Sequence, residues 1–173
     1  MKYHNWNVRR PGSPGVRRTL EAAGLAPLCA SLLSARGINT PEEAARFLAS
    51  GPERFHDPFL LTDMDKAVGR VRRAIESGET IAVYGDYDVD GITATCLLTE
   101  ALTLLGGTVA SYIPDRTEEG YGLNPHAVDR LAGDGVGLIV TVDCGITAVG
   151  EVEYARSLGV DVVVTDHHHC KDK

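Results

Sequence analysis

The sequence predicts an α/β fold with a parallel β-sheet flanked by helices, preceded by a small helical region. From residue 80 onward, short runs rich in valine and isoleucine alternate with longer segments of helical character. Each longer segment is followed by a glycine, which commonly ends a helix. Strands that alternate with helices in this way form a parallel sheet, because right-handed crossovers return the chain to the same end of the sheet.

The first region, residues 1–62, is expected to consist of an arm and short helices. Residues 1–15 are rich in proline and glycine and have few apolar anchors, which indicates an extended arm. Two short helices are expected to follow it. The second is marked by a capping box formed by Thr40 and Glu43, with Pro41 at the first helical position.

The second region, residues 63–173, is expected to contain the sheet. It opens with a predicted helix at residues 64–77, whose apolar residues share one face and which Gly78 ends. Strands are expected at residues 80–84, 108–113, 137–142 and 160–165, with helices between them at 92–105, 125–132 and 147–158.

The net charge of -7 is unevenly distributed along the chain. Residues 1–20 carry +5, residues 21–78 carry -1 and residues 79–173 carry -11. A negative total argues against a generic nucleic-acid binder, and a solvated acidic surface would account for most such counts. The position of the acids in the sequence indicates a more specific role.

No apolar run approaches the roughly 20 residues that span a bilayer, and the N-terminus lacks the apolar stretch of a secretion signal. A cytoplasmic protein with no membrane partner is therefore expected. The cysteines form no Cys-x-x-Cys pair, so neither a disulfide framework nor a zinc ribbon is indicated. Reduced and mostly buried thiols are expected at Cys29, Cys96, Cys144 and Cys170.

Acidic and histidine residues follow all four predicted strands. Open parallel sheets bind their ligands beyond the carboxyl ends of the strands, where the loops converge. Four separate loops are therefore expected to bring carboxylates and imidazoles to one region. Their segments are residues 85–91, 114–116, 143–145 and 166–169.

Such a group of side chains indicates a divalent metal site. Close carboxylates repel one another and are tolerated mainly when cations neutralise them. Carboxylate oxygens with one or two imidazoles suit Mn²⁺ or Mg²⁺, and the histidines favour Mn²⁺. Zinc stays an alternative, although no thiolate cluster supports it.

The first acidic loop could also be a calcium loop or a plain turn. Asp86, Asp88 and Asp90 alternate as at the start of an EF-hand calcium loop, but the twelfth position is Leu97 instead of glutamate and a strand precedes the loop. A plain turn also uses aspartate and glycine, yet three alternating acids exceed what a turn needs.

Two further segments allow a simpler interpretation when each is taken alone. The histidines at 167–169 with Cys170 could be a solvated tail, a tag remnant or an incidental metal binder. Asp143 could cap the next helix. The convergence of all four loops favours the metal site over these alternatives.

The four segments resemble the motifs of the DHH superfamily of phosphoesterases. The matching residues are 84–93, 113–122, 142–146 and 165–168, and the last contains the Asp-His-His signature. Residues 36–44 and 57–65 extend the likeness upstream. They resemble the single-strand-specific exonucleases of the superfamily, in contrast to shorter relatives that cleave nanoRNA, cyclic dinucleotides or pyrophosphate. The resemblance implies a Rossmann-like domain at residues 63–173.

The resemblance also implies a role for each matching residue. Asp88 and Asp90 would bind one metal ion each. Asp143 would bridge the two ions, and His167 would bind the second. Four residues would form the catalytic group around the ions: His168, Asp143, Asp86 and Asp166.

Within that group, His168 would contact the scissile phosphate. Asp86 and Asp166 would lie next to the metal ligands and orient them. Arg116 would meet a substrate phosphate or hold the loop of the second motif.

The implied reaction is hydrolysis of a phosphodiester by a metal-bound water, with two Mn²⁺ or Mg²⁺ ions about 3.5 to 4 Å apart. Nucleotides would be released successively from the 5′ end of single-stranded DNA, in DNA repair and recombination. A single-strand-binding protein and a helicase would be partners. Two alternatives stay open: a phosphodiesterase for short RNA or cyclic dinucleotides, and a non-catalytic binding module.

The sequence departs from the family pattern in two places. Many relatives have a histidine ligand four residues before the Asp-x-Asp pair, where this chain has Tyr84. The family also supplies a later metal-binding aspartate and a second domain that grips nucleic acid. The 173 residues resemble an N-terminal fragment without these parts, which is expected to fold but to show little nuclease activity alone.

Overall fold

The computed structural model describes residues 12–51 and 55–170. The chain divides into two compact units, residues 1–58 and residues 59–173. The first unit is helical, and the second contains the sheet. Among the described residues, no helix has the length and apolar character needed to cross a membrane.

The first unit contains three short helices: α1 (Pro14–Ala22), α2 (Pro27–Ala35) and α3 (Pro41–Leu48). Each begins with a proline, whose missing N–H is not needed in the first helical turn. Their small apolar core is formed by Leu20, Ala30, Leu33 and Ala44.

The capping box predicted at the start of α3 is present, with Thr40 and Glu43 each bonded to the other's backbone N–H. The prediction of two helices was wrong, because this unit has three among its described residues. The prediction of the arm was also wrong at its end, because α1 begins at Pro14. The Ser13 hydroxyl accepts a hydrogen bond from the Val16 N–H and caps that helix. Residues 1–11 of the expected arm lie outside the described residues.

The second unit is built on a parallel sheet of four strands in the order β2-β1-β3-β4. The strands are β1 (Thr80–Tyr84), β2 (Thr108–Tyr112), β3 (Val136–Val142) and β4 (Asp161–Thr165). After β1 the chain moves outward to β2, and it then returns to the other side of β1 as β3. Such a reversal of strand order opens a crevice at the carboxyl ends of the strands, where open sheets bind ligands.

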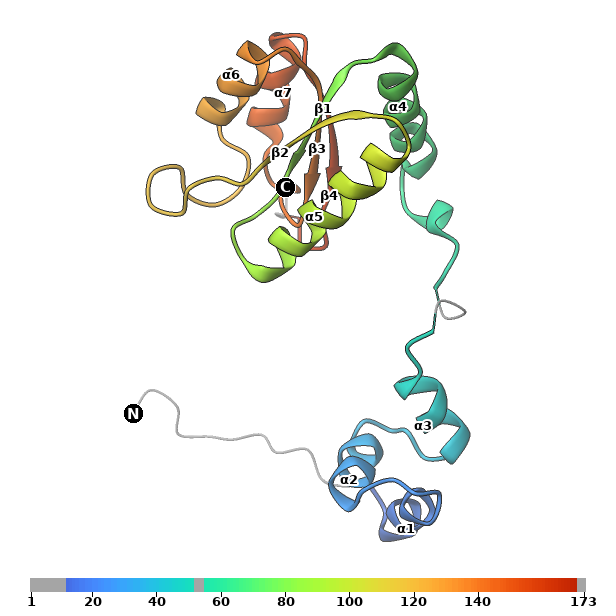
Figure 1. Ribbon diagram of the computed structural model, residues 1–173. Coiled ribbons are helices and arrows are strands. Elements are labelled where there is room, and N and C mark those ends of the chain that lie inside the picture. Colours follow the sequence, from blue (N-terminus) through green and yellow to red (C-terminus); the bar gives the residue numbers. More distant parts are fainter. Residues whose placement is uncertain (1–11, 52–54, 171–173) are drawn as a thin grey trace, which may run out of the picture. The chain divides into compact units, whose positions relative to one another are not determined.

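Helices cover both faces of the sheet, as Figure 1 shows. The α4 (Met64–Ser77) and α5 (Val89–Leu104) helices pack on one face, and α6 (Pro125–Gly133) and α7 (Val149–Ser157) pack on the other. A short 3₁₀ helix, Pro58–Leu60, precedes α4. Side chains of β1 alternate between the two cores: Ile81 and Val83 face α4 and α5, and Ala82 and Tyr84 face α6 and α7.

The predicted α/β fold is confirmed, and its elements differ from the predicted ranges only at their ends. The largest shift is at α5, which begins at Val89 instead of residue 92. It starts earlier because the Asp88 carboxylate accepts hydrogen bonds from the N–H groups of Asp90 and Gly91 and caps the helix.

The expectation of mostly buried thiols was wrong. All four cysteines are free, and Cys29, Cys96 and Cys170 are exposed. Only Cys144 is buried, and burial raises the pKa of its thiol to about 12. A free cysteine packs as a small apolar residue, and its spacing in a sequence does not reveal which side of a helix it occupies.

Arg70 of α4 joins three strands at the end of the sheet away from the crevice. Its guanidinium donates to Glu79 before β1 at 2.6 Å, to the Gly137 carbonyl of β3 at 3.3 Å and to Asp161 of β4 at 2.5 Å. Only 16% of this side chain is exposed, so solvent screens the ion pairs less than it would on the surface.

Arg70→Ala is therefore expected to lower the free energy of unfolding by about 1–3 kcal/mol, because two carboxylates and a carbonyl each lose a hydrogen-bond donor. Urea denaturation followed by circular dichroism measures the change. Arg73→Ala, which removes an exposed arginine from the same helix, is the matched control and is expected to change stability by less than about 0.5 kcal/mol. Equal effects of the two substitutions would contradict this role of Arg70.

Candidate metal centre

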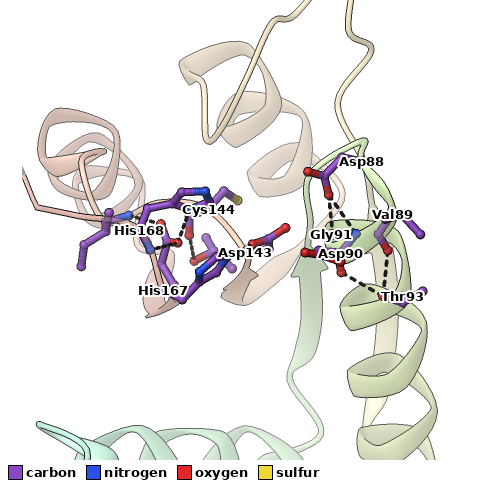
Figure 2. A network of polar contacts seen from close by, with 12 residues as sticks. Asp88, Val89, Asp90, Gly91, Thr93, Asp143, Cys144, His167 and His168 are labelled. Carbon is purple, nitrogen blue, oxygen red and sulfur yellow. Dashed lines mark hydrogen bonds and ion pairs between the residues drawn. The ribbon is translucent and has the colours of Figure 1, made fainter. Parts of the chain in front are cut away.

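The carboxyl ends of β3 and β4 bring three potential metal ligands together. Asp143 follows β3, while His167 and His168 follow β4. Ligand atoms of the three residues all lie within 4.8 Å of one another, and Asp143 Oδ1 is 2.8 Å from His167 Nε2. Figure 2 shows these side chains gathered beside one another. Because β3 and β4 are paired neighbours, the residues that follow them emerge together.

The backbone bends at Asp143, directly after β3. Asp143 has a φ of 62°, in the left-handed region, and its N–H donates to the Thr165 carbonyl at 3.1 Å. Aspartate and asparagine are the side chains that tolerate this region best. The side chain of Asp143 is only 8% exposed, whereas that of His167 is 72% exposed. The carboxylate thus forms the floor of the group, with the imidazole open to solvent.

Asp166 fixes the orientation of His168. Its buried carboxylate accepts from the His168 Nδ1 at 2.7 Å, from the His168 backbone N–H at 3.1 Å and from the Ile146 N–H at 2.9 Å. Burial acts to raise the pKa of Asp166, but the hydrogen bonds from Ile146 and His168 outweigh it, so this pKa is lowered. The same contact raises the pKa of His168. With Nδ1 engaged, the Nε2 atom of His168 is left for a ligand.

The start of α5 brings Asp88 close to this group. Hydrogen bonds from Gly91 and Asp90 lower the pKa of the Asp88 carboxyl, and the nearby Asp143 and His168 lower it further, against the effect of burial. Asp90 is exposed in the first turn of the helix. Figure 2 shows both carboxylates at this helix terminus, across from Asp143. Neither belongs to the group of three whose ligand atoms lie within 4.8 Å.

Asp86 carries an unsatisfied oxygen at the start of this loop. Only 3% of the residue is exposed, and its Oδ1 has no hydrogen-bond partner among the described residues. A buried carboxylate oxygen without a donor is costly unless a cation compensates it. This oxygen and the neighbouring acids therefore fit a divalent cation with oxygen and imidazole ligands.

Two glycines allow the acidic loop to lie against α5. A Cβ atom on Gly91 would stand 2.5 Å from the Asp86 carbonyl oxygen, and one on Gly85 would stand 1.9 Å from the Thr95 hydroxyl. Both distances are shorter than van der Waals contact. The loop can hold its acids in this position only because neither residue has a side chain.

The loop after β2 contributes Arg116 and Tyr121 to the surroundings. Arg116 lies over the ring of Tyr87 at 5.2 Å, beside a cavity of about 680 Å³. The residues that line this cavity include none of Asp143, His167 and His168. The Tyr121 hydroxyl lies 3.3 Å from the Asp143 carbonyl and 3.4 Å from His168 Nδ1.

Sequence reasoning missed Tyr121. Burial, followed by the charge of Asp166 and other nearby acids, raises its pKa to about 12, so the phenol keeps its proton at neutral pH. The only signal in the sequence was its place between Gly120 and Gly122 in the second motif. Both glycines have a positive φ, which lets the loop turn toward the centre.

At Tyr84, where the resemblance led us to expect a histidine ligand, the side chain makes other contacts. The residue is fully buried, and its hydroxyl donates to the Gly122 carbonyl at 2.8 Å and accepts from Asn124 at 3.2 Å. Burial raises the pKa of this phenol. Because the Tyr84 hydroxyl is protonated and already hydrogen-bonded, it is not available as a metal ligand.

Residues 80–173 match the sequence model described as the DHH family, N-terminal domain, and these residues are more than half of the chain. The chain belongs to the DHH family. This match covers the whole sheet and all four loops of the candidate centre. The resemblance predicted from the motifs is therefore confirmed.

Curated relatives of this DHH-family chain include two single-stranded-DNA-specific exonucleases named RecJ. The protein from Bacillus subtilis is 44% identical over 94% of the chain, and the one from Escherichia coli is 42% identical over 84% of it. The aligned residues are 21% and 25% of the length of those relatives. The chain thus spans a quarter or less of these proteins.

Solved structures similar to the DHH-family chain are also RecJ proteins. A RecJ in complex with Mn²⁺ from Thermus thermophilus aligns with a TM-score of 0.67 and 30% identity, over 94% of this chain and 22% of that one. Exonuclease RecJ bound to manganese aligns with a TM-score of 0.61 and 40% identity, over 65% of this chain and 29% of that one. Both names include the ion that the donor set of this chain suits.

Proposed function

We propose that this DHH-family chain is the metal-binding part of a nuclease that hydrolyses single-stranded DNA. The observation that carries the proposal is the convergence of Asp143, His167 and His168 at the carboxyl ends of two neighbouring strands. The names of the relatives support single-stranded DNA as the substrate. The proposed reaction proceeds from the 5′ end and releases one nucleotide after another.

The proposed centre holds two Mn²⁺ or Mg²⁺ ions. We assign the metal ligands by motif and by position as Asp88, Asp90, Asp143 and His167. When bound, such ions lower the pKa of a coordinated water and stabilise charge on the attacking and leaving oxygens. Asp143 would be shared between the ions, since its carboxylate lies beside both His167 and Asp88.

The remaining residues of the centre act on the phosphate and on the ligands. His168 presents Nε2 to the scissile phosphate, because Asp166 engages its Nδ1. Asp86 orients the first loop and offers its unpaired oxygen to the centre. Arg116, held over Tyr87, supplies a positive charge for a phosphate of the DNA strand.

The biological setting proposed for the reaction is DNA repair and recombination in the cytoplasm, where a helicase would supply single strands and a single-strand-binding protein would cover them. Substrate choice would depend on parts beyond these residues, because the chain spans a quarter or less of the RecJ relatives. We therefore propose that the 173-residue chain binds metal but degrades DNA far more slowly than an intact protein.

Metal titration tests the proposed centre directly. Calorimetry of the 173-residue chain with Mn²⁺ is expected to reveal binding, and His167→Ala is expected to weaken it by at least about tenfold. His169→Ala is the matched control, because His169 is an exposed neighbour outside the three-residue group, and it is expected to leave the affinity unchanged. Absence of binding would support the non-catalytic module instead.

A substrate comparison tests the reaction. A protein that contains this chain at the full length of its relatives is incubated with Mn²⁺ and 5′-phosphorylated single-stranded DNA, duplex DNA or a dinucleotide. We expect the single strand to be degraded at least about tenfold faster than the others. Preference for the dinucleotide would favour the alternative of a phosphodiesterase for short RNA or cyclic dinucleotides.

A further inference from the structure

Two tyrosines end neighbouring strands and lie directly opposite each other. Tyr84 is the last residue of β1 and Tyr112 the last of β2, and they are register partners. Their rings are stacked, with centroids 5.2 Å apart and an interplanar angle of 11°. Tyr84 is fully buried and Tyr112 is partly buried. The pair forms a rigid aromatic platform under the loop that follows β2.

Both hydroxyl groups hold that loop, residues 113–124. The Tyr84 hydroxyl donates to the Gly122 carbonyl at 2.8 Å. The Tyr112 hydroxyl donates to the Glu119 carboxylate at 2.6 Å, and the second oxygen of Glu119 accepts from the Asp115 N–H at 2.8 Å. The loop is thereby bonded to the strands at Glu119 and Gly122, and Glu119 also holds the beginning of the loop at Asp115.

The tied positions enclose the part of the loop that reaches the metal centre. Tyr121 lies between Glu119 and Gly122, and its hydroxyl is within 3.4 Å of both the Asp143 carbonyl and His168 Nδ1. Its ring meets those of Tyr87 and His168 edge-on. Since both neighbouring glycines, 120 and 122, allow many backbone conformations, the position of Tyr121 depends on the ties on either side of it.

We propose that Tyr84 and Tyr112 are positioning residues, whose hydroxyl groups hold residues 113–124 in the conformation that presents Tyr121 and Arg116 to a nucleic-acid strand at the metal centre. This inference rests on the proposed function for the identity of the ligand. Tyr84 therefore acts on the loop that meets the substrate. Its contribution is made through the loop and leaves the ions untouched.

The competing possibility is that Tyr84 only fills the core. Phenylalanine would fill it equally well and keep the stacking on Tyr112, so Tyr84→Phe removes only the hydroxyl group and its hydrogen bonds with Gly122 and Asn124. The substitution leaves the Gly122 carbonyl without this donor. A single net hydrogen bond of this kind corresponds to about a three- to tenfold change in an equilibrium.

Hydrogen exchange measures how firmly the Tyr84 hydroxyl holds the loop, and it does so independently of catalysis. In Tyr84→Phe, backbone amides of residues 113–124 are expected to exchange about three- to tenfold faster, while Mn²⁺ affinity stays within about twofold of the wild type. The matched control is Tyr154→Phe, which removes a hydroxyl bond to Asp129 from α7 on the same face of the sheet. It is expected to leave the exchange of the loop unchanged.

Kinetics of a protein that contains this chain at the length of its relatives test the consequence for the substrate. Tyr84→Phe is expected to raise KM for single-stranded DNA about three- to tenfold with little change in kcat, and Tyr112→Phe is expected to act in the same direction. Unchanged loop exchange, unchanged KM or a tenfold loss of Mn²⁺ affinity would each overturn the inference.

The two proposals fail in distinguishable ways. If the wild-type protein binds Mn²⁺ and cleaves no DNA, the proposed function fails. The positioning role is then judged by loop exchange together with the affinity for a non-cleaved oligonucleotide, which Tyr84→Phe should lower about three- to tenfold. An unchanged affinity there would overturn the positioning role as well.

Discussion

Asp143→Ala in a protein that contains this chain at the length of its relatives is expected to abolish nuclease activity. Asp143 lies beside both the histidines after β4 and Asp88 at the start of α5. Its loss would remove the ligand proposed to be shared between the ions. The attacking water and the leaving oxygen would then lack the pair of ions that positions them and stabilises their charge.

Asp143→Asn separates the charge of this residue from its conformation. Asparagine tolerates the left-handed φ of 62° as well as aspartate does, so the turn should persist. Alanine at this φ is expected to cost about 1–2 kcal/mol of stability. We therefore expect both variants to be nearly inactive, while only Asp143→Ala has a lowered melting temperature.

The measurement is the rate of Mn²⁺-dependent release of nucleotides from single-stranded DNA, with thermal melting of each variant alongside. Asp134→Asn, a change of an exposed aspartate at the end of α6, is the matched control and is expected to retain full activity. An Asp143 variant with activity within about tenfold of the wild type would contradict the assignment, because a shared metal ligand cannot be lost at so small a cost.

Much of the candidate centre could be predicted from the sequence because parallel strands impose a common direction. Once residues 80–84, 137–142 and 160–165 were identified as strands, Asp86, Asp143 and Asp166 had to emerge at the same end of the sheet. The alternation of apolar strands with helices ended by glycine carried that prediction. This prediction did not require the order of the strands, since every loop at that end of the sheet approaches the crevice.

The directions of individual side chains could not be predicted from the sequence. Tyr84 and Asp86 are close neighbours in the chain, yet their side chains differ in their contacts. The Tyr84 hydroxyl donates to the loop after β2, whereas Asp86 has an oxygen without a hydrogen-bond partner among the described residues. Tyr121 is held near Asp143 by ties such as the hydrogen bond from Tyr84 to Gly122, whose partners are 38 positions apart along the chain. Tertiary contacts of this kind leave no local pattern in a sequence.

The error at α1 has a different cause, because its signal was present in the local sequence. The α1 helix follows a segment rich in proline and glycine, and it begins there because Pro14 can occupy the first helical turn once Ser13 caps it. Proline and glycine content alone predicted an arm. A capping residue directly before a proline was the signal for a helix.

In a protein that contains this chain at the length of its relatives, chelation is expected to remove nuclease activity. The sheet-containing unit is expected to stay folded. Two apolar clusters hold this unit together, one on each face of the sheet, and neither includes the candidate metal ligands. Bound ions stabilise the folded state only through their own affinity, by about 2.7 kcal/mol at a concentration one hundred times the dissociation constant. The melting temperature should therefore fall by several degrees in EDTA, with a cooperative transition still present.

Circular dichroism melting with Mn²⁺ and with EDTA tests this expectation, and activity is measured on the same samples. Returning Mn²⁺ in excess should restore both the melting temperature and the nuclease activity, because the strands and their loops stay assembled without it. Loss of all secondary structure on chelation would contradict the prediction and would make the ions structural, as in small domains whose folding depends on metal. The outcome turns on Asp86 and Asp143, which are nearly buried in the unit and must tolerate their negative charges when no cation is bound.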